Sequence, residues 1–353
     1  MQIFPYIYEP DKSIEVYGLT NSYLTENPEV KKKIETLGWI YHEVGLIIPQ
    51  TMENFWSGHY FPYRESWEEL QIALTSCFFG LYKQAFVSLR SALELGMLSV
   101  YYNINDDGHN TVSDWYRSSD SFESNTPRTD KVWKILFSNI NIKNFNDKFD
   151  LRSKYDKLMF LHNYVHTKGL KFSNSLGTLK GNFQTFEEEV LNSWLKTYEE
   201  IAVIITTLHL LKYPLAVVHF DYRKKFGIDM PSFGGLEKDK IERMASILPD
   251  DYIREIETIA AYDPQTRKTI SEITSLPDLT EEQLDEQILN SHKFSIEHGE
   301  GFIQWESNLN KLYNESFKIE MEERTRQHIE ILRQWALENE FMESKPKRLG
   351  WNI

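Results

Sequence analysis

The chain has 353 residues, of which 41% are hydrophobic and 26% charged, and this balance excludes an intrinsically disordered protein. Its length exceeds that of most single domains, so we expect two domains. The single cysteine, Cys77, excludes an internal disulfide and a multi-cysteine zinc site, and its apolar neighbours in "LTSCFFG" predict an inert core thiol.

The net charge of −14 is unevenly distributed. Residues 228–353 hold 26 acidic and 15 basic side chains, a net of −11, whereas residues 1–227 carry only −3. An acidic surface repels phosphate, which argues against broad nucleic-acid binding through the C-terminal part and leaves room for an RNA substrate in a local pocket of the first part. The chain shows neither a secretory leader at its start nor an apolar window long enough for a bilayer, so we expect a cytoplasmic protein with no membrane contact.

Helical spacing dominates the first part, and strand-like alternation is almost absent, so the sequence predicts an all-α fold. The first predicted helix has Asn27 as its N-cap and Pro28 at its first position, and it continues to Pro49. Apolar residues at helical spacing over 65–80 and 81–102 predict either two helices interrupted at Gly80 or one kinked rod. Residues 103–147 read as a long loop with short helical pieces.

Two further helices follow. Residues 147–169 predict a long helix that ends near Gly169, and residues 185–213 predict another that opens with a Thr185 cap and stops before Pro214. We therefore assign residues 1–226 to a helical bundle domain and the glycine-rich residues 227–235 to a linker. Residues 236–353 predict an acidic helical C-terminal domain, with helices at 236–248, 250–262 and 280–294 and a long final helix over 301–342.

The stretch "LMFLHNYVHTKG" places His162 and His166 four residues apart, on one face of the predicted helix over 147–169. Each histidine is either a core residue satisfied by hydrogen bonds or a functional group in a crevice. His209, in "ITTLHLLKY", lies on an apolar stretch and is interpreted as a core histidine.

Arg90 and Glu94 lie one turn apart on an otherwise apolar helix face in "SLRSALELGMLSVYY". Burying an unpaired charge is unfavourable, so these two side chains either form a structural salt bridge or hold Arg90 as a phosphate-binding cation. Facing His162 and His166, they would form a polar pocket in an apolar bundle. A zinc site built from the two histidines and Glu94 is a weaker alternative, because Asn163 replaces the glutamate found inside the metalloprotease motif.

The combination of "SLRSALELGMLSVYY", "DWYRSS" and "YDKLMFLHNYVHTKG" resembles the HEPN superfamily (higher eukaryotes and prokaryotes nucleotide-binding) over about residues 65–215. The resemblance implies a helical bundle that forms a homodimer and cleaves RNA without metal or other cofactor, in bacterial anti-phage or toxin–antitoxin systems. It assigns His166 to the family histidine and Asn163 to its polar companion. His162 stands near the position of the family arginine, so Arg90 would have to enter from the other helix.

Two functional hypotheses follow. In the first, the chain is a HEPN-like endoribonuclease or toxin whose catalytic residues are His166, His162, Asn163, Arg90 and Glu94, and whose acidic C-terminal domain contacts a protein partner. In the second, it is a catalytically inactive binding or scaffold protein in which the same polar residues hold the bundle together.

Overall fold

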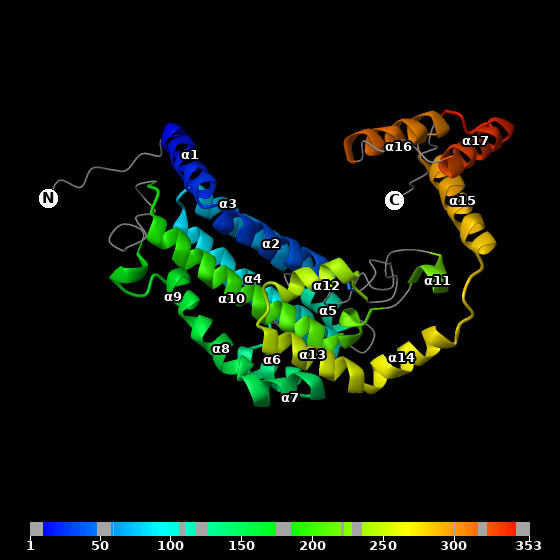
Figure 1. Ribbon diagram of the computed structural model, residues 1–353. Coiled ribbons are helices and arrows are strands. Elements are labelled where there is room, and N and C mark those ends of the chain that lie inside the picture. Colours follow the sequence, from blue (N-terminus) through cyan, green and yellow to red (C-terminus); the bar gives the residue numbers. More distant parts are fainter. Residues whose placement is uncertain are drawn as a thin grey trace. The chain divides into compact units, whose positions relative to one another are not determined.

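The computed structural model describes residues 10–47, 58, 60–105, 110–117, 126–173, 185–219, 222–227, 235–299, 301–316 and 323–343. All regular elements in these residues are helices, which confirms the all-α fold (Figure 1). The chain divides into two compact units, one of residues 1–220 with 231–271 and one of residues 221–230 with 272–353. Each unit has its own hydrophobic core.

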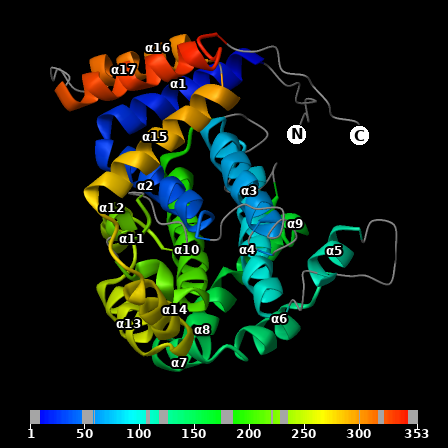
Figure 2. The ribbon, with the colours of Figure 1, turned by 90° about the vertical axis from the view of Figure 1, so that its right-hand side faces the viewer.

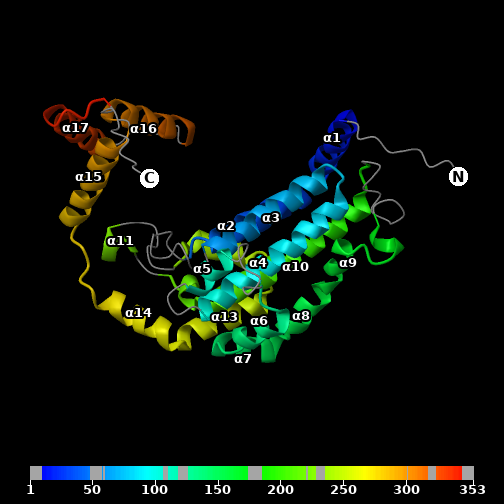
Figure 3. The same cartoon turned by 180° about the vertical axis from the view of Figure 1, so that it is seen from behind.

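Four long helices build the centre of the first unit: α2 (Pro28–Val44), α3 (Phe61–Phe78), α4 (Tyr82–Asn105) and α10 (Glu188–Lys212). Helix α4 packs against both α3 and α10, and the helix axes run side by side in Figures 1 and 3. Gly96 lies where α4 meets α2 and α10. A Cβ atom at Gly96 would lie 2.7 Å from the Tyr41 hydroxyl oxygen and 2.9 Å from Cγ2 of Ile205, so only glycine fits there without a shift of its neighbours.

Gly80 ends the α3 segment and turns the chain back into α4. Its φ of 72° lies in the left-handed region, which glycine adopts without the steric penalty of a Cβ atom. The Gly80 N–H donates to the Cys77 carbonyl and the Leu81 N–H to the Ser76 carbonyl, which satisfies two carbonyls at the helix end. The chain therefore forms two separate helices here, the first of the two predicted alternatives, and not one kinked rod. Cys77 is buried, and its burial raises the pKa of the thiol well above its ordinary value.

Shorter helices surround this centre. They are α1 (Pro10–Glu26), α5 (Asn110–Tyr116), α6 (Thr129–Leu136), α7 (Ile140–Phe149), α8 (Leu151–Lys157), α9 (His162–Val165), α12 (Lys238–Ala245) and α13 (Asp250–Tyr262). Helix α14 (Pro264–Ser275) contains the boundary between the two units, which falls after Ser271. Figure 2 shows α13 beside α7, where the rings of Phe145 and Tyr252 meet with centroids 4.9 Å apart.

Helices α12 and α13 belong to the first unit, whereas the sequence-based division placed residues 236–271 in the C-terminal domain. The Lys240 ammonium pairs with Glu43 at 2.7 Å, and the Arg243 guanidinium lies 3.8 Å from the centroid of the Trp39 ring. Both contacts join α12 to α2. The cations of α12 therefore cover α2. Residues 228–234 of the expected linker lie outside the described residues.

The second unit contains α11 (Tyr222–Phe226), α15 (Glu281–His298), α16 (Phe302–Ser316) and α17 (Glu323–Glu338). The single final helix expected over 301–342 is wrong, because α16 and α17 are separate elements. The Phe302 N–H donates to the Phe341 carbonyl at 2.9 Å, so the start of α16 is joined to the segment that follows α17. Buried Phe302 and Leu332 pack in the core that these helices share.

Candidate polar site

The candidate site begins with an ion pair on α4. The Nη2 atom of Arg90 lies 2.9 Å from Oε1 of Glu94, and the two side chains retain only 22% and 34% of their exposure. The spacing of one helical turn places both groups on the same face, as the sequence predicts. The pair is therefore formed within one helix and partly withdrawn from water.

His162, at the start of α9, completes a cluster with this pair. Arg90 Nε donates a hydrogen bond to His162 Nδ1 at 3.2 Å. Because a guanidinium can only donate, Nδ1 must be the unprotonated nitrogen and the ring proton lies on Nε2, which faces Glu94 Oε1 at 3.7 Å. Burial and the neighbouring Arg90 charge lower the pKa of His162, although Glu94 acts in the opposite direction. The hydrogen bond accepted by Nδ1 and the lowered pKa of His162 both favour the neutral imidazole.

Two contacts next to this cluster hold the α9 segment against α4. The rings of Phe86 and Tyr164 stack with centroids 4.7 Å apart and planes 8° from parallel. The Lys83 ammonium donates to the Thr167 hydroxyl at 2.6 Å. These contacts fix His162 opposite Arg90, so the convergence of residues 72 positions apart follows from packing and not from local sequence.

The continuous helix expected over 147–169 is wrong, and the difference changes the place of His166. Asp150 adopts a φ of 55° between α7 and α8, and a 3₁₀ turn over Leu158–Leu161 separates α8 from α9. The tighter 3₁₀ winding alters the face on which later residues fall. Helix α9 ends at Val165, so His166 lies beyond it with an exposed side chain, while Asn163 is half-buried.

A cleft of about 350 Å³ opens beside the cluster. Arg90 and Glu94 form one wall, and Arg128 and Thr129 from the start of α6 form the opposite one. Buried Tyr155 lines the cleft, where its hydroxyl bonds the Thr129 side chain and burial raises its pKa. His162 does not line the cleft, but it contacts both residues of the first wall.

The segment that carries α6 to α9 is basic. Residues 126–173 hold ten basic and four acidic side chains, a net of +6 in a chain whose net charge is −14. All eight lysines of this segment are exposed: Lys131, Lys134, Lys143, Lys148, Lys154, Lys157, Lys168 and Lys171. Arg152 is engaged by Asp156 at 2.9 Å and Asp130 at 3.3 Å. This local excess of positive charge was detectable in the sequence, but an average over residues 1–227 concealed it.

His209 is a core histidine, as interpreted from the sequence. Its side chain is fully buried, with Nδ1 at 2.8 Å from the Ile205 carbonyl oxygen and Nε2 at 2.9 Å from the Ser99 hydroxyl. Both ring nitrogens are satisfied within the α4–α10 contact, so His209 does not join the polar cluster.

The zinc alternative is not favoured by the geometry. Within the described part of the chain, no group of three His, Cys, Asp or Glu side chains is arranged to hold a metal ion. The set considered from the sequence, His162, His166 and Glu94, does not converge as three ligands would.

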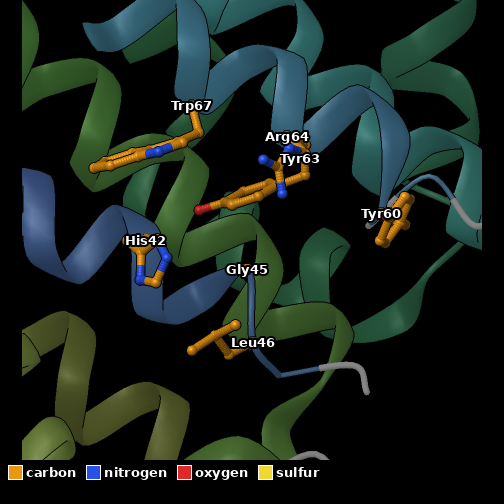
Figure 4. Close-up of a pocket in the computed structure, with 7 residues that line it drawn as sticks. All are labelled: His42, Gly45, Leu46, Tyr60, Tyr63, Arg64 and Trp67. Carbon is orange, nitrogen blue, oxygen red and sulfur yellow. The ribbon is translucent and has the colours of Figure 1, made fainter. Parts of the chain in front are cut away.

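A smaller pocket of about 120 Å³ lies between the end of α2 and the start of α3 (Figure 4). Trp67 and Tyr63 lie on one side of it and His42 and Leu46 on the other. Tyr63 is fixed by its hydroxyl, which donates to the Tyr41 carbonyl. The pocket is mainly aromatic and lies apart from the Arg90 cluster.

The second unit contains a histidine pair that the sequence analysis missed. Nδ1 of His292 on α15 lies 2.9 Å from Nε2 of His328 on α17, and the ring centroids are 5.1 Å apart. The two nitrogens therefore point almost directly at each other, as in a hydrogen bond between neutral imidazoles. Burial lowers the pKa of both, His328 further lowers that of His292, and Asp285 opposes the effect at His328. Histidines 36 positions apart carry no local motif that could have revealed the pair.

Comparisons of the chain with models of known protein families, with curated proteins and with solved structures find no match. In the residues that the structure describes, no helix is long and apolar enough to cross a membrane.

Proposed function

We propose that the chain is a HEPN-like, metal-independent endoribonuclease of a bacterial defence or toxin system. The observation that carries the proposal is the convergence of Arg90, Glu94 and His162 beside a cleft whose far wall belongs to a segment of net charge +6. The positive charge of this segment attracts a polyanion, and an imidazole can exchange protons near neutral pH.

The exposed imidazole of His166 is free to accept the proton of an RNA 2′-hydroxyl. The 2′-oxygen then attacks the adjacent phosphorus, the bond from phosphorus to the 5′-oxygen breaks, and that oxygen takes up a proton from water. The products are a 2′,3′-cyclic phosphate and a 5′-hydroxyl. Arg90, kept in place by Glu94 and His162, stabilises the negative charge that develops on the phosphorus oxygens. Half-buried Asn163 is the polar companion in this scheme.

The test uses the full-length protein, EDTA and two substrates of the same sequence, one RNA and one 2′-O-methyl RNA. The proposal predicts cleavage of the RNA alone, with cyclic phosphate ends. Intact RNA, or cleavage of both substrates, would contradict it. Toxicity on expression that disappears with His166→Ala would show that the same activity operates inside the cell. Sedimentation of the purified protein tests the homodimer that the resemblance implies.

A scaffold function is the second candidate, because Arg90, Glu94 and His162 satisfy one another within the fold. In that case His162→Ala lowers stability, and neither histidine substitution changes any RNA-directed activity. The acidic C-terminal residues would then supply the surface for a protein partner.

A further inference from the structure

The cleft contains two arginines, and they are in different electrostatic situations. Arg90 is neutralised by Glu94 at 2.9 Å and donates its Nε hydrogen to His162. A phosphate approaching Arg90 therefore also meets the Glu94 carboxylate. This opposition weakens Arg90 as the primary anchor for an anion.

Arg128, on the opposite wall, is exposed and directly precedes α6. Among the described residues no carboxylate pairs with it, because the nearest acidic residue along the chain, Asp130, pairs with Arg152 instead. An unpaired guanidinium at the edge of a cleft offers a fork of N–H donors that matches two oxygens of a phosphate.

The space between the two walls suits one nucleotide of a strand. The volume of about 350 Å³ lies at the lower end of the range for small-ligand pockets. Met97, Leu98, Pro127 and Val132 supply an apolar lining on which a base can rest. Residues 126–173, which supply the Arg128 wall and Tyr155, carry a net charge of +6, and such a field favours the backbone of a longer polyanion over a single small anion.

We propose that Arg128 is the phosphate-binding cation of this cleft, and that it holds a phosphodiester of single-stranded RNA while the attached base lies on the apolar lining. The inference rests on the proposed ribonuclease function, since it assigns the substrate contact for that site. Arg128 then anchors the bound phosphodiester, while Arg90, held by Glu94 and His162, acts on the charge that develops during the reaction.

Binding can be measured without cleavage by using a fluorescein-labelled 2′-O-methyl oligonucleotide, which lacks the attacking hydroxyl. Anisotropy titrations of the full-length protein are run at several salt concentrations with wild type, Arg128→Gln and Arg254→Gln. Arg254 is the matched control, because it is an exposed arginine on α13 of the same unit and does not line the cleft. Circular dichroism and the unfolding midpoint confirm that both variants are folded.

We expect Arg128→Gln to weaken binding about 10-fold at low salt and to reduce the salt slope by about one, as for the loss of one phosphate contact. Arg254→Gln should bind like wild type. Unchanged affinity and slope in Arg128→Gln, absence of binding in wild type, or displacement of the probe by equimolar 5′-AMP would each overturn the proposal. If Arg128→Gln loses binding and wild type cleaves no RNA, Arg128 is confirmed as the phosphate-binding residue and the ribonuclease function is refuted. If wild type cleaves RNA and Arg128→Gln has an unchanged KM, the ribonuclease function is confirmed and the role of Arg128 is refuted.

Discussion

The contact between Arg90 and His162 predicts a measurable coupling in stability. The hydrogen bond spans 3.2 Å and involves a charged donor, a type that contributes about 1.5–3 kcal/mol when shielded from water. The two side chains keep 22% and 35% of their exposure, so solvent screening reduces this figure. We expect a coupling energy of about 1 kcal/mol between Arg90→Ala and His162→Ala.

The assay is a double-mutant cycle of urea unfolding, followed by circular dichroism and tryptophan fluorescence, with both single variants and the double variant. A second cycle that pairs Arg90→Ala with His166→Ala is the control, because His166 is exposed and makes no side-chain bond to Arg90 in the described structure. If the effects of Arg90→Ala and His162→Ala add within about 0.3–0.5 kcal/mol, the two residues do not interact and the cluster described here is refuted.

Three further outcomes are expected. Gly80→Ala should destabilise the protein by about 2 kcal/mol in urea unfolding, because φ is 72° and the new Cβ would lie 2.8 Å from the Thr185 carbonyl oxygen; Gly18→Ala, which meets nothing within 4 Å, should not. The second unit should lose stability as the pH falls below about 6.5, because the lowered pKa of His292 and of His328 lets the unfolded chain bind protons that the folded unit does not. The substitution His328→Gln should reduce this pH dependence, and equal unfolding midpoints at about pH 7.5 and 5.5 would contradict the histidine pair. RNA cleavage should be unchanged after dialysis against EDTA, and restoration by added zinc or magnesium would contradict the metal-independent reaction.

Much of the helical architecture was predictable because local signals agreed with the tertiary structure. Pro28 at the first position of α2 and Pro214 after α10 mark helix ends through backbone chemistry alone. The expected caps were less accurate. Asn27 directs its side-chain amide to the Tyr23 carbonyl, and α10 begins at Glu188 with no cap from Thr185.

The candidate site was predictable only in part. Arg90 and Glu94 share a helix face by spacing, and the apolar setting of His162 correctly indicated a position facing them. The exposure of His166 depends on the end of α9 at Val165, which comes four residues before the predicted end near Gly169. The place of Arg128 depends on how α6 packs against α4, which is a tertiary property.

The central claim is most directly tested by the rate of RNA cleavage by His166→Ala and His162→Ala, compared with wild type and with His298→Ala, a substitution at an exposed histidine of the second unit. All four proteins are assayed in EDTA at concentrations corrected for the folded fraction. The account predicts that His166→Ala abolishes cleavage while its stability stays within about 0.5 kcal/mol of wild type, as expected for an exposed position. It also predicts that His162→Ala loses both activity and stability, and that His298→Ala matches wild type. Cleavage that persists in a variant lacking both His162 and His166 would contradict the account.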